Sequence, residues 1–504
     1  MQITGKVAVI TGGARGFGKR LAEMITEKGG KVVLGDVLPE GAQVAADLNK
    51  QHGSKVAVFS ICDVCQSSNL ESLVALAVSE FGALDIMVNN AGISGTLPWA
   101  DSDTTSLART IDINLKAPLE GTRLAVRYFL QNKRPGCVVN VASMMAFFPT
   151  EFGPVYGATK SGVVNFTASC ATLAQMEPPI RVNAIAPNFA DTAMVRDSLP
   201  KDNNQVFKMT GILTVDEVVL QMIRCIEDDS LAGDVIKMLP GKTPLLHNGR
   251  KAVSSASGFG KRLAETVVEM GGKVVLGDIL LEGAQVAASL NRREQDKVAV
   301  FQKCDVTRFK DIEALMARAT REFGVFDVMV NNAGVVGSLL WTDKDGSSHS
   351  RALDINLKAP IEGTRLAVKY FTEMGIPGCV INVSSMMAFF PMEFGPVYGA
   401  AKSGLVNFTA SCATLAQLNP PIRVNAVAPN YTDTPFICTP LVQESREFDK
   451  SNLLKTEEVV AQMVRCMEDE RLAGDTLLII RGKPPLLYKG KKAEPSGILT
   501  SAKL

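Results

Sequence analysis

The sequence predicts an α/β protein built from two tandem doubly wound parallel-sheet domains, and three observations lead to this prediction. The chain has 504 residues, which is too long for one ordinary domain and comfortable for two. Its first half recurs in its second half. Within each half, short uninterrupted apolar runs alternate with segments of helical periodicity, as in a parallel sheet that helices cover on both faces.

The internal repeat is defined by motifs that recur at a constant spacing. Asn89-Asn90-Ala91-Gly92 recurs as Asn331-Asn332-Ala333-Gly334, and Tyr156 recurs as Tyr398, which is 242 residues later. A period this long indicates a duplicated domain and excludes a solenoid repeat. Turn-forming and polar residues near the join and near the end predict the boundaries. We predict copy one over residues 1–245, copy two over residues 246–490, and a flexible tail over residues 491–504.

The expected elements of copy one follow in order along the chain. Apolar runs predict strands over residues 7–10, 32–34, 56–59, 86–88, 138–141 and 182–185. Helical patterns between them include residues 18–28 and 69–81. In a doubly wound sheet the ligand crevice lies at the carboxyl ends of the strands. The residues that directly follow these strands are therefore the first candidates for a functional site.

A glycine-rich loop follows the first expected strand and opens a helix. It reads Thr11-Gly12-Gly13-Ala14-Arg15-Gly16-Phe17-Gly18. Glycines at such a junction let a pyrophosphate approach backbone N–H groups at a helix N-terminus. Asp36 ends the second strand, where its carboxylate can bind ribose hydroxyls and would repel the 2′-phosphate of NADP. The loop therefore predicts an NAD site with these candidate residues: Gly12, Arg15, Gly16, Phe17, Gly18 and Asp36.

Copy two departs from this loop. Asp278 matches Asp36, but Gly12 and Gly13 are replaced by Ser254 and Ser255. The apolar run of the first strand is also lost in residues 247–252. Side chains at positions that need positive φ or a close phosphate approach cost about 1–3 kcal/mol each. We therefore expect copy two to bind NAD poorly.

Candidate reacting groups stand near the fifth strand and the helix after it. Tyr156 and Lys160 are four residues apart, so they share one helical face. A free tyrosine has a pKa of about 10, and a neighbouring cation favours its phenolate. Ser143 ends the fifth strand and can reach the same crevice. This set predicts proton transfer by Tyr156 while Ser143 holds the substrate oxygen.

These motifs, taken together and in order, resemble the short-chain dehydrogenase/reductase family, a family with the Rossmann fold. The shared motifs are T-G-x-x-x-G-x-G, N-N-A-G, the serine and Y-x-x-x-K, and within the family the chain is most similar to the NAD-dependent 15-hydroxyprostaglandin dehydrogenase group. The resemblance implies that Asn114 anchors a proton-relay water and that Lys160 also binds the nicotinamide ribose. It further implies cofactor contacts from Asp63, Val64, Asn90, Ile185 and Thr192, the last two at the carboxamide. Copy two retains Asn356, Ser385, Tyr398 and Lys402.

The composition excludes several other classes of function. The net charge is +1, so no electrostatic footprint favours nucleic acid or a membrane surface. No apolar run reaches the roughly 18 residues of a membrane span, and the first residues lack a secretory signal. Ten cysteines and three histidines lack the spacing of a zinc site, because the Cys62/Cys65 pair has no second pair. We expect no metal.

The substrate is predicted to be a small hydrophobic alcohol or ketone. Residues 144–149 read Met-Met-Ala-Phe-Phe-Pro beside the reacting groups and recur at 386–391, which favours an apolar pocket. The region after Thr192 differs between the copies, so if both copies act they should not share one substrate. A peroxisomal 3-hydroxyacyl-CoA dehydrogenase, and a non-catalytic role for copy two, remain alternatives.

The chain ends in Ala502-Lys503-Leu504, which resembles the S-K-L peroxisomal address. We therefore expect a peroxisomal import receptor as a partner and a peroxisomal location, with the cytoplasm as the alternative. We also expect the copies to form an internal pseudo-dimer through the segments that carry Asn114 and Tyr156, with further self-association left open.

Overall fold

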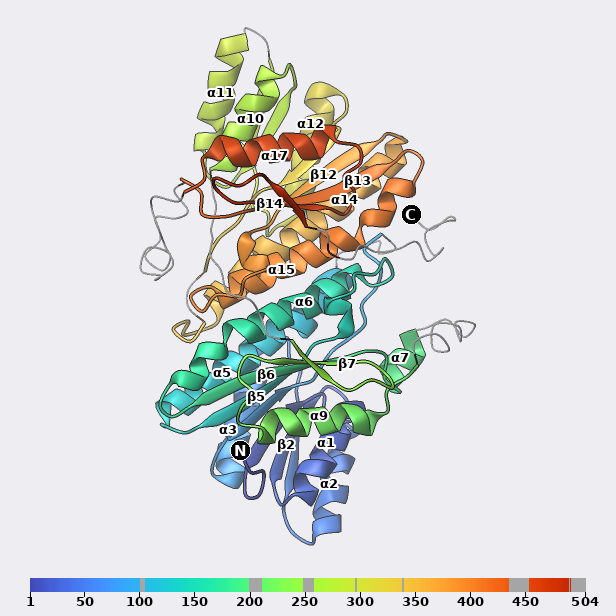
Figure 1. Cartoon of the computed structure of the whole chain (residues 1–504), viewed down its shortest axis with the longest axis vertical. Coiled ribbons are helices and arrows are strands. Elements are labelled where there is room, and N and C mark those ends of the chain that lie inside the picture. Colours follow the sequence, from blue (N-terminus) through green and yellow to red (C-terminus); the bar gives the residue numbers. More distant parts are fainter. Residues whose placement is uncertain are drawn as a thin grey trace.

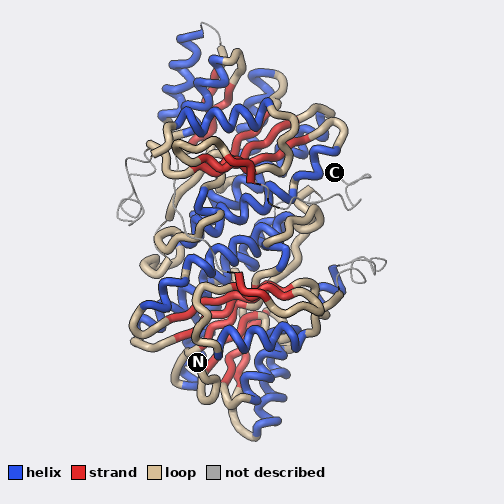
Figure 2. Tube along the Cα trace, in the orientation of Figure 1, coloured by secondary structure: helices blue, strands red, loops and turns tan. Residues whose placement is uncertain are grey.

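The computed structural model describes residues 1–99, 105–198, 211–247, 258–294, 297–337, 340–434, 453–488 and 490. These residues form two α/β halves, as the sequence predicts, and the two halves lie against each other along a pair of central helices (Figure 1). Strands run through the middle of each half and helices lie on either side of them (Figure 2). Among the described residues, no helix combines the length and the apolar character that crossing a bilayer requires.

Copy one contains one eight-stranded sheet in the order β3-β2-β1-β4-β5-β6-β7-β8. Neighbouring strands are parallel, except that β7 and β8 are antiparallel. The order reverses between β1 and β4, which is where a doubly wound sheet opens its ligand crevice. The strands are β1 (Val7–Thr11), β2 (Lys31–Asp36), β3 (Ala57–Ile61), β4 (Ile86–Asn89), β5 (Gly136–Val141), β6 (Ile180–Pro187), β7 (Val235–Met238) and β8 (Leu245–His247).

Helices cover both faces of this sheet because its strands alternate their side chains between two apolar cores. In β1, Val7 and Val9 join the core under α3, α5 and α6, whereas Ala8 and Ile10 join the core under α1, α2 and α9. The helices are α1 (Gly16–Glu27), α2 (Gly41–His52), α3 (Ser67–Phe81), α4 (Thr105–Ile111), α5 (Ala117–Gln131), α6 (Pro154–Ser169), α7 (Ala193–Ser198) and α9 (Val215–Glu227).

The expected boundary between residues 245 and 246 needs a correction, because it falls inside β8. This strand pairs with β7 through Leu245, Leu246 and His247 and so belongs to the sheet of copy one. The apolar pair Leu245-Leu246 was too short to stand out as a strand in the sequence. The predicted tail, residues 491–504, lies outside the described residues.

Copy two repeats the same order of elements, but its sheet is divided. A two-stranded sheet has the order β10-β9, and a five-stranded sheet has the order β11-β12-β13-β14-β15. The strands are β9 (Val274–Asp278), β10 (Ala299–Lys303), β11 (Val328–Asn331), β12 (Gly378–Val383), β13 (Ile422–Pro429), β14 (Thr476–Ile479) and β15 (Leu486–Tyr488). The helices are α10 (Phe259–Glu269), α11 (Glu282–Glu294), α12 (Phe309–Phe323), α13 (Ser347–Leu353), α14 (Ala359–Met374), α15 (Pro396–Ser411) and α17 (Thr456–Glu468).

The division falls where copy one has β1. In copy one, β1 pairs with β2 on one side and with β4 on the other. No strand among the described residues of copy two joins β9 to β11. All four residues of β4 are buried, whereas all four residues of β11 are only partly buried. The loss of the apolar first strand, predicted from the sequence, therefore leaves both neighbouring strands of copy two more open to solvent.

The two copies meet through α6 and α15, which lie side by side at the centre of the molecule (Figure 1). Glycines allow the close approach: a β-carbon added to Gly162 would lie 3.0 Å from the carbonyl oxygen of Ala400. Ser161 and Ser403, which are equivalent residues, touch each other with their hydroxyls 3.1 Å apart. One apolar core runs continuously from copy one into copy two. This packing is the internal pseudo-dimer that the sequence predicts.

A buried ionic cluster borders this contact. The Arg123 guanidinium is fully buried and donates to both oxygens of Glu120, at 2.7 and 2.6 Å. It also donates to the carbonyl oxygen of Asp343 in copy two, at 2.8 Å. His349 of copy two is buried beside them, with its ring nitrogens 3.0 Å from Asp343 and 3.4 Å from Glu120. No sequence motif had pointed to this histidine.

Candidate active site

The glycine loop of copy one has the backbone shape that the sequence predicts for a phosphate-binding turn. Gly12 and Gly16 have φ values of 67° and 57°, in the left-handed region that favours glycine. A β-carbon added to Gly18 would lie 2.1 Å from the carbonyl oxygen of Gly12. The loop can therefore form only with glycines at these positions, and it leads directly into the N-terminus of α1. Arg15 precedes that helix and is exposed, and Phe17 is partly buried in its first turn.

Asn90, at the carboxyl end of β4, fixes this loop from the side. Its amide nitrogen donates to the carbonyl oxygens of Thr11 and Gly12 at 2.9 and 3.0 Å. The Thr11 hydroxyl in turn accepts a hydrogen bond from the backbone N–H of Asn90 at 3.1 Å. The two strand ends at the reversal of the sheet are thus tied together. Such a rigid cradle fits the pyrophosphate of a dinucleotide.

Asp36 lies at the carboxyl end of β2, beside the loop. Its carboxylate is buried and accepts hydrogen bonds from the backbone N–H groups of Ala14 and Leu38, at 3.0 and 3.1 Å. Each carboxylate oxygen has further capacity to accept hydrogen bonds. Asp63 and Val64 follow the adjacent β3, and Cys62 donates to the Asp36 carbonyl at 2.8 Å. These residues together form the side of the crevice where an adenosine would lie.

The predicted reacting groups come together at the ends of β5 and α6. The Lys160 ammonium donates to the carbonyl oxygen of Val141 at 2.7 Å and lies 5.6 Å from the centre of the Tyr156 ring. The Tyr156 hydroxyl forms a hydrogen bond with Ser143. A β-carbon added to Gly92 would lie 3.3 Å from Asn114 Oδ1 and 3.7 Å from Lys160 Nζ. Asn114, Lys160 and the end of the N-N-A-G motif are therefore neighbours.

Asn114 sits in an irregular turn of helix and is fully buried. Residues Asp112–Lys116 form a π-helical turn between α4 and α5, a feature often found at functional sites. The Asn114 amide donates to the Ile93 carbonyl at 2.7 Å and accepts from the Ile93 N–H at 2.9 Å. Its orientation is thus fixed by the segment that follows β4. The sequence could place Asn114 in this region but could not show the turn.

Burial acts on the acid–base groups of copy one. Burial raises the pKa of Tyr156, and its hydrogen bond with Ser143 partly opposes this. Burial lowers the pKa of Lys160 to about 8, so the lysine remains mainly cationic at neutral pH. A cation and a hydrogen-bond donor next to a phenol both favour the phenolate. The arrangement can hold a hydroxyl or carbonyl oxygen and exchange a proton with it.

Copy two repeats these groups, but they are more enclosed. Asn356 also lies in a π-helical turn, and Lys402 donates to the Val383 carbonyl at 2.7 Å. Tyr398 is 2% exposed and Ser385 is 0% exposed, whereas Tyr156 is only partly buried. Tyr398 packs with Met387, Met392 and Phe394 in a separate apolar cluster. Burial lowers the pKa of Lys402 to about 7 and raises that of Tyr398.

On the expected cofactor side of copy two, the key side chains form fewer hydrogen bonds with described residues than their equivalents in copy one. Asp278 is exposed, and among the described residues its carboxylate accepts a hydrogen bond only from the Leu280 N–H, at 3.0 Å. Asn332, the equivalent of Asn90, forms no hydrogen bond with the described part of the chain, whereas Asn90 joins two strand ends. The serine loop itself, with Ser254 and Ser255, lies outside the described residues.

The two residues that the resemblance places at the carboxamide lie at the carboxyl end of β6 and just after it. Ile185 is fully buried near the end of β6, and its carbonyl accepts from the Ala142 N–H at 2.8 Å. The Thr192 methyl group would lie 3.8 Å from a β-carbon added to Gly16. Contact of either residue with a carboxamide stays a prediction. Asn188 replaces a family glycine without adopting a positive φ.

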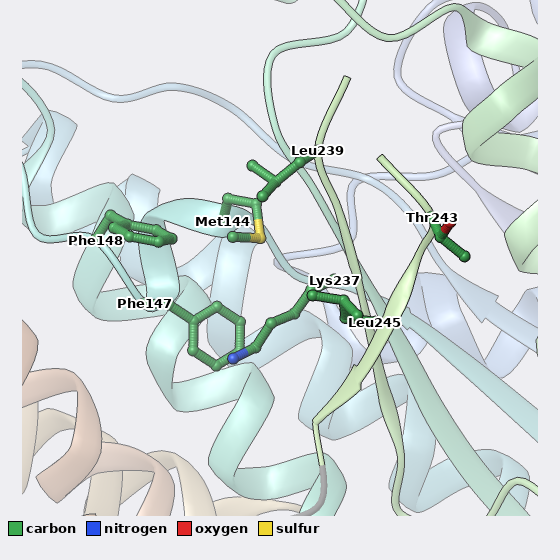
Figure 3. A pocket seen from close by; sticks show the side chains of 7 residues that line it. All are labelled: Met144, Phe147, Phe148, Lys237, Leu239, Thr243 and Leu245. Atoms are coloured by element: carbon green, nitrogen blue, oxygen red, sulfur yellow. The ribbon is translucent and has the colours of Figure 1, made fainter. Parts of the chain in front are cut away.

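A pocket of about 390 Å³ lies beside the segment that follows Ser143, and Figure 3 shows the side chains that line it. Most of its lining is apolar, and Met144 directly follows Ser143. Thr243 is polar and Lys237 is charged, and the Lys237 ammonium lies 3.7 Å from the centre of the Phe147 ring. The lining residues are Met144, Phe147, Phe148, Lys237, Leu239, Thr243 and Leu245. The sequence predicts the first three of them. The other four, in β7 and the segment after it, were not predicted.

Each copy also holds the active-site loop of the other. Asn407 of copy two donates to the carbonyl oxygens of Met145 and Ala146 in copy one, at 3.2 and 3.1 Å. Asn165 of copy one donates to the Met387 and Ala388 carbonyls at 3.0 and 3.2 Å. A β-carbon added to Gly157, next to Tyr156, would lie 2.7 Å from Asn407 Oδ1. These contacts join the two copies, and their residues are too far apart in the sequence for a motif to predict them.

Comparison with solved structures shows that the fold likeness covers both halves together. The N-domain of a bacterial malonyl-CoA reductase, solved with NADP, covers 95% of this chain and 98% of its own, with a TM-score of 0.70 and 16% identity. The C-domain of such an enzyme, also solved with NADP, covers 95% and 99%, with a TM-score of 0.72 and 14% identity. At these identities the likeness shows a shared fold only.

Sequence comparison identifies the family. The model of the short chain dehydrogenase family matches residues 6–203 and 252–440. Human 15-hydroxyprostaglandin dehydrogenase [NAD(+)] is 35% identical over 258 residues, which are 48% of this chain and 94% of the relative. The 3beta-hydroxysteroid dehydrogenase 2 of Eggerthella lenta is 36% identical over 38% of this chain and 73% of its own. The chain therefore belongs to the short-chain dehydrogenase family as a tandem of two Rossmann copies, and it is an oxidoreductase that uses a nicotinamide cofactor.

Proposed function

We propose that copy one transfers a hydride between a hydrophobic secondary or fatty alcohol and NAD, and that copy two contributes little turnover. The observation that carries this proposal is the joint presence in copy one of a partly exposed Tyr156 and a complete glycine cradle. In copy two the equivalent tyrosine is enclosed and the sheet is divided beside the cofactor side.

The residues of copy one fit a nicotinamide dinucleotide. The cradle of Gly12, Gly16 and Gly18 would take the pyrophosphate, and Asp36 would accept hydrogen bonds from the adenosine ribose. A 2′-phosphate beside the buried Asp36 carboxylate would be repelled, which favours NAD over NADP. The cofactor, when bound, supplies the hydride acceptor. Asp63, Val64, Asn90 and Thr192 border the same crevice.

Four side chains of copy one have separate roles in binding the alcohol and moving its proton. The Ser143 hydroxyl holds the oxygen of the alcohol, and Tyr156 accepts its proton. The Lys160 ammonium stabilises the phenolate by its charge. Asn114, held by Ile93 in the π-helical turn next to Lys160, would anchor a water that relays the proton. These are the roles that the family resemblance implies for the matching residues.

The apolar pocket supports a hydrophobic substrate. Met144, Phe147 and Phe148 line it directly after Ser143, and apolar linings with few polar groups are typical of sites for small apolar ligands. The names of the relatives agree with this class, since they describe dehydrogenases of a hydroxyprostaglandin, a hydroxysteroid and, in Lavandula x intermedia, borneol.

The test is a screen of the full chain with NAD and hydroxy-fatty acids, steroids and prostanoids, followed by two matched variants. Tyr156→Phe should remove nearly all turnover on the best substrate, and Tyr398→Phe should leave most of it. Calorimetry should give one tight NAD site per chain. Two equal NAD sites, or a larger loss from Tyr398→Phe, would contradict the assignment of turnover to copy one.

We also propose a peroxisomal location through recognition of Ala502-Lys503-Leu504 by an import receptor. A fluorescent protein fused in front of residues 491–504 should enter peroxisomes, and deletion of Leu504 should return it to the cytoplasm. A cytoplasmic signal from the intact fusion would contradict the proposal.

A further inference from the structure

Lys237 is the unexpected member of the pocket, because it places a cation in an apolar setting. It is partly buried, and burial lowers its pKa. Among the described residues no carboxylate forms an ion pair with it, and its ammonium contacts the face of the Phe147 ring at 3.7 Å. Figure 3 shows the ammonium pointing at this ring within the pocket. A partly desolvated cation without a counter-ion is costly unless an anion joins it.

The position of Lys237 in the sheet connects it with the reacting groups. In the register of β6 and β7, Lys237 pairs with Ala186 and Met238 pairs with Pro187. The Ser143 hydroxyl contacts the Pro187 carbonyl at 3.5 Å. Lys237 is two residues beyond Val235, so both face the core that α6 covers, and α6 carries Tyr156. The lysine and the phenol thus border the same side of the sheet.

Copy two shows that the fold does not need this lysine. The equivalent position is Leu478, which pairs with Ala428 in the same register. There the ring of Tyr488 packs edge to face on Phe389, the equivalent of Phe147, with ring centres 4.6 Å apart. The ring equivalent to Phe147 therefore contacts an aromatic ring in copy two, where copy one has the ammonium of Lys237. The difference between the copies lies in what the pocket can bind.

We infer that the Lys237 pocket of copy one binds the carboxylate of an apolar carboxylic acid, with its chain along Met144, Phe148 and Leu239. The inference rests on the proposed function, because it makes the substrate of copy one a hydroxy acid or keto acid whose reacting carbon reaches Tyr156. The carboxylate and the Lys237 ammonium form a charge-assisted hydrogen bond that the surrounding apolar side chains strengthen.

The test measures binding first, since binding does not depend on turnover. Decanoate and its neutral counterpart 1-decanol are titrated into the full chain by calorimetry. Lys237→Met should weaken decanoate binding about 10-fold to 100-fold, the usual worth of a hydrogen bond between charged groups, and should leave 1-decanol binding nearly unchanged. Lys242→Met, which changes an exposed lysine in the nearby turn, is the matched control and should affect neither ligand.

Turnover separates this inference from the proposed function. With 9-hydroxydecanoate and its methyl ester, Lys237→Met should raise KM for the acid and leave kcat and the ester unchanged. Equal weakening of decanoate and 1-decanol, or no effect on either, would show that Lys237 only packs against Phe147 and would overturn the inference. If decanoate binding depends on Lys237 but no alcohol in the screen is oxidised, the subsite stands and the proposed function falls.

Discussion

At the scale of single residues, Asp36 combines two tasks that a substitution can separate. Its carboxylate accepts from the Ala14 N–H inside the glycine loop and also faces the place of the ribose. Asp36→Asn keeps an acceptor but removes the charge, so NAD binding should weaken moderately and NADP binding should improve. Asp36→Ala loses both the acceptor and the charge, so it also removes the repulsion of the 2′-phosphate and should narrow the gap between NAD and NADP. Titration of the two oxidised cofactors checks this; wild-type protein that prefers NADP would contradict the assigned role.

The sequence could identify residues whose meeting depends on local spacing, and it could not identify residues whose role depends on contacts between distant segments. Ser143, Tyr156 and Lys160 lie on one strand end and one helix, so local spacing was sufficient to predict their meeting. Ile185 was assigned from the family resemblance alone, because its position in the motif says nothing about which way a strand residue points. Contacts between segments far apart in the chain give Lys237, Asn407 and His349 their surroundings. A pattern within one segment does not show which distant segment packs against it.

At the scale of elements, α15 of copy two supports the first turn of α6 in copy one. Asn407 holds two carbonyls of the loop after Ser143, and its Oδ1 lies against Gly157 without a hydrogen bond from the described residues. Asn407→Ala should lower kcat about 10-fold to 100-fold, because small displacements of reacting groups are costly, with little change in KM. Asn165→Ala, the equivalent change toward copy two's loop, should leave kcat near wild type. A similar loss in both variants would show a general effect on packing.

The buried cluster between α5 and α13 predicts a pH dependence of stability. Burial lowers the pKa of His349, while Glu120 and Asp343 partly oppose this and Arg123 adds to it. A histidine whose folded-state pKa lies below its unfolded value of about 6.5 binds fewer protons when folded, so stability falls as pH falls below that value. Thermal unfolding between pH 7 and pH 5 should show this fall, and His349→Gln should reduce it. An unchanged slope in the variant would contradict the role of His349.

At the scale of the whole molecule, the divided sheet makes copy two less cooperative than copy one. Strands β9 and β10 pair only with each other among the described residues, whereas β2 and β3 continue into six further strands. Local opening is easier where fewer strands and fewer buried contacts hold a unit. Hydrogen exchange should therefore be faster in residues 274–303 than in residues 31–61, and NAD should slow exchange in the second range only. Equal exchange rates in the two ranges would show that other contacts stabilise β9 and β10 and would contradict this prediction.

The reciprocal asparagine contacts also bear on how a duplicated gene can diverge. Selection does not remove mutations in the glycine loop of copy two if copy one alone turns over the substrate. Selection does act on mutations in α15, because Asn407 supports the loop beside Tyr156. Selection on the first half of the gene thus preserves part of the second. A fused partner that contributes little turnover can still be needed for full activity.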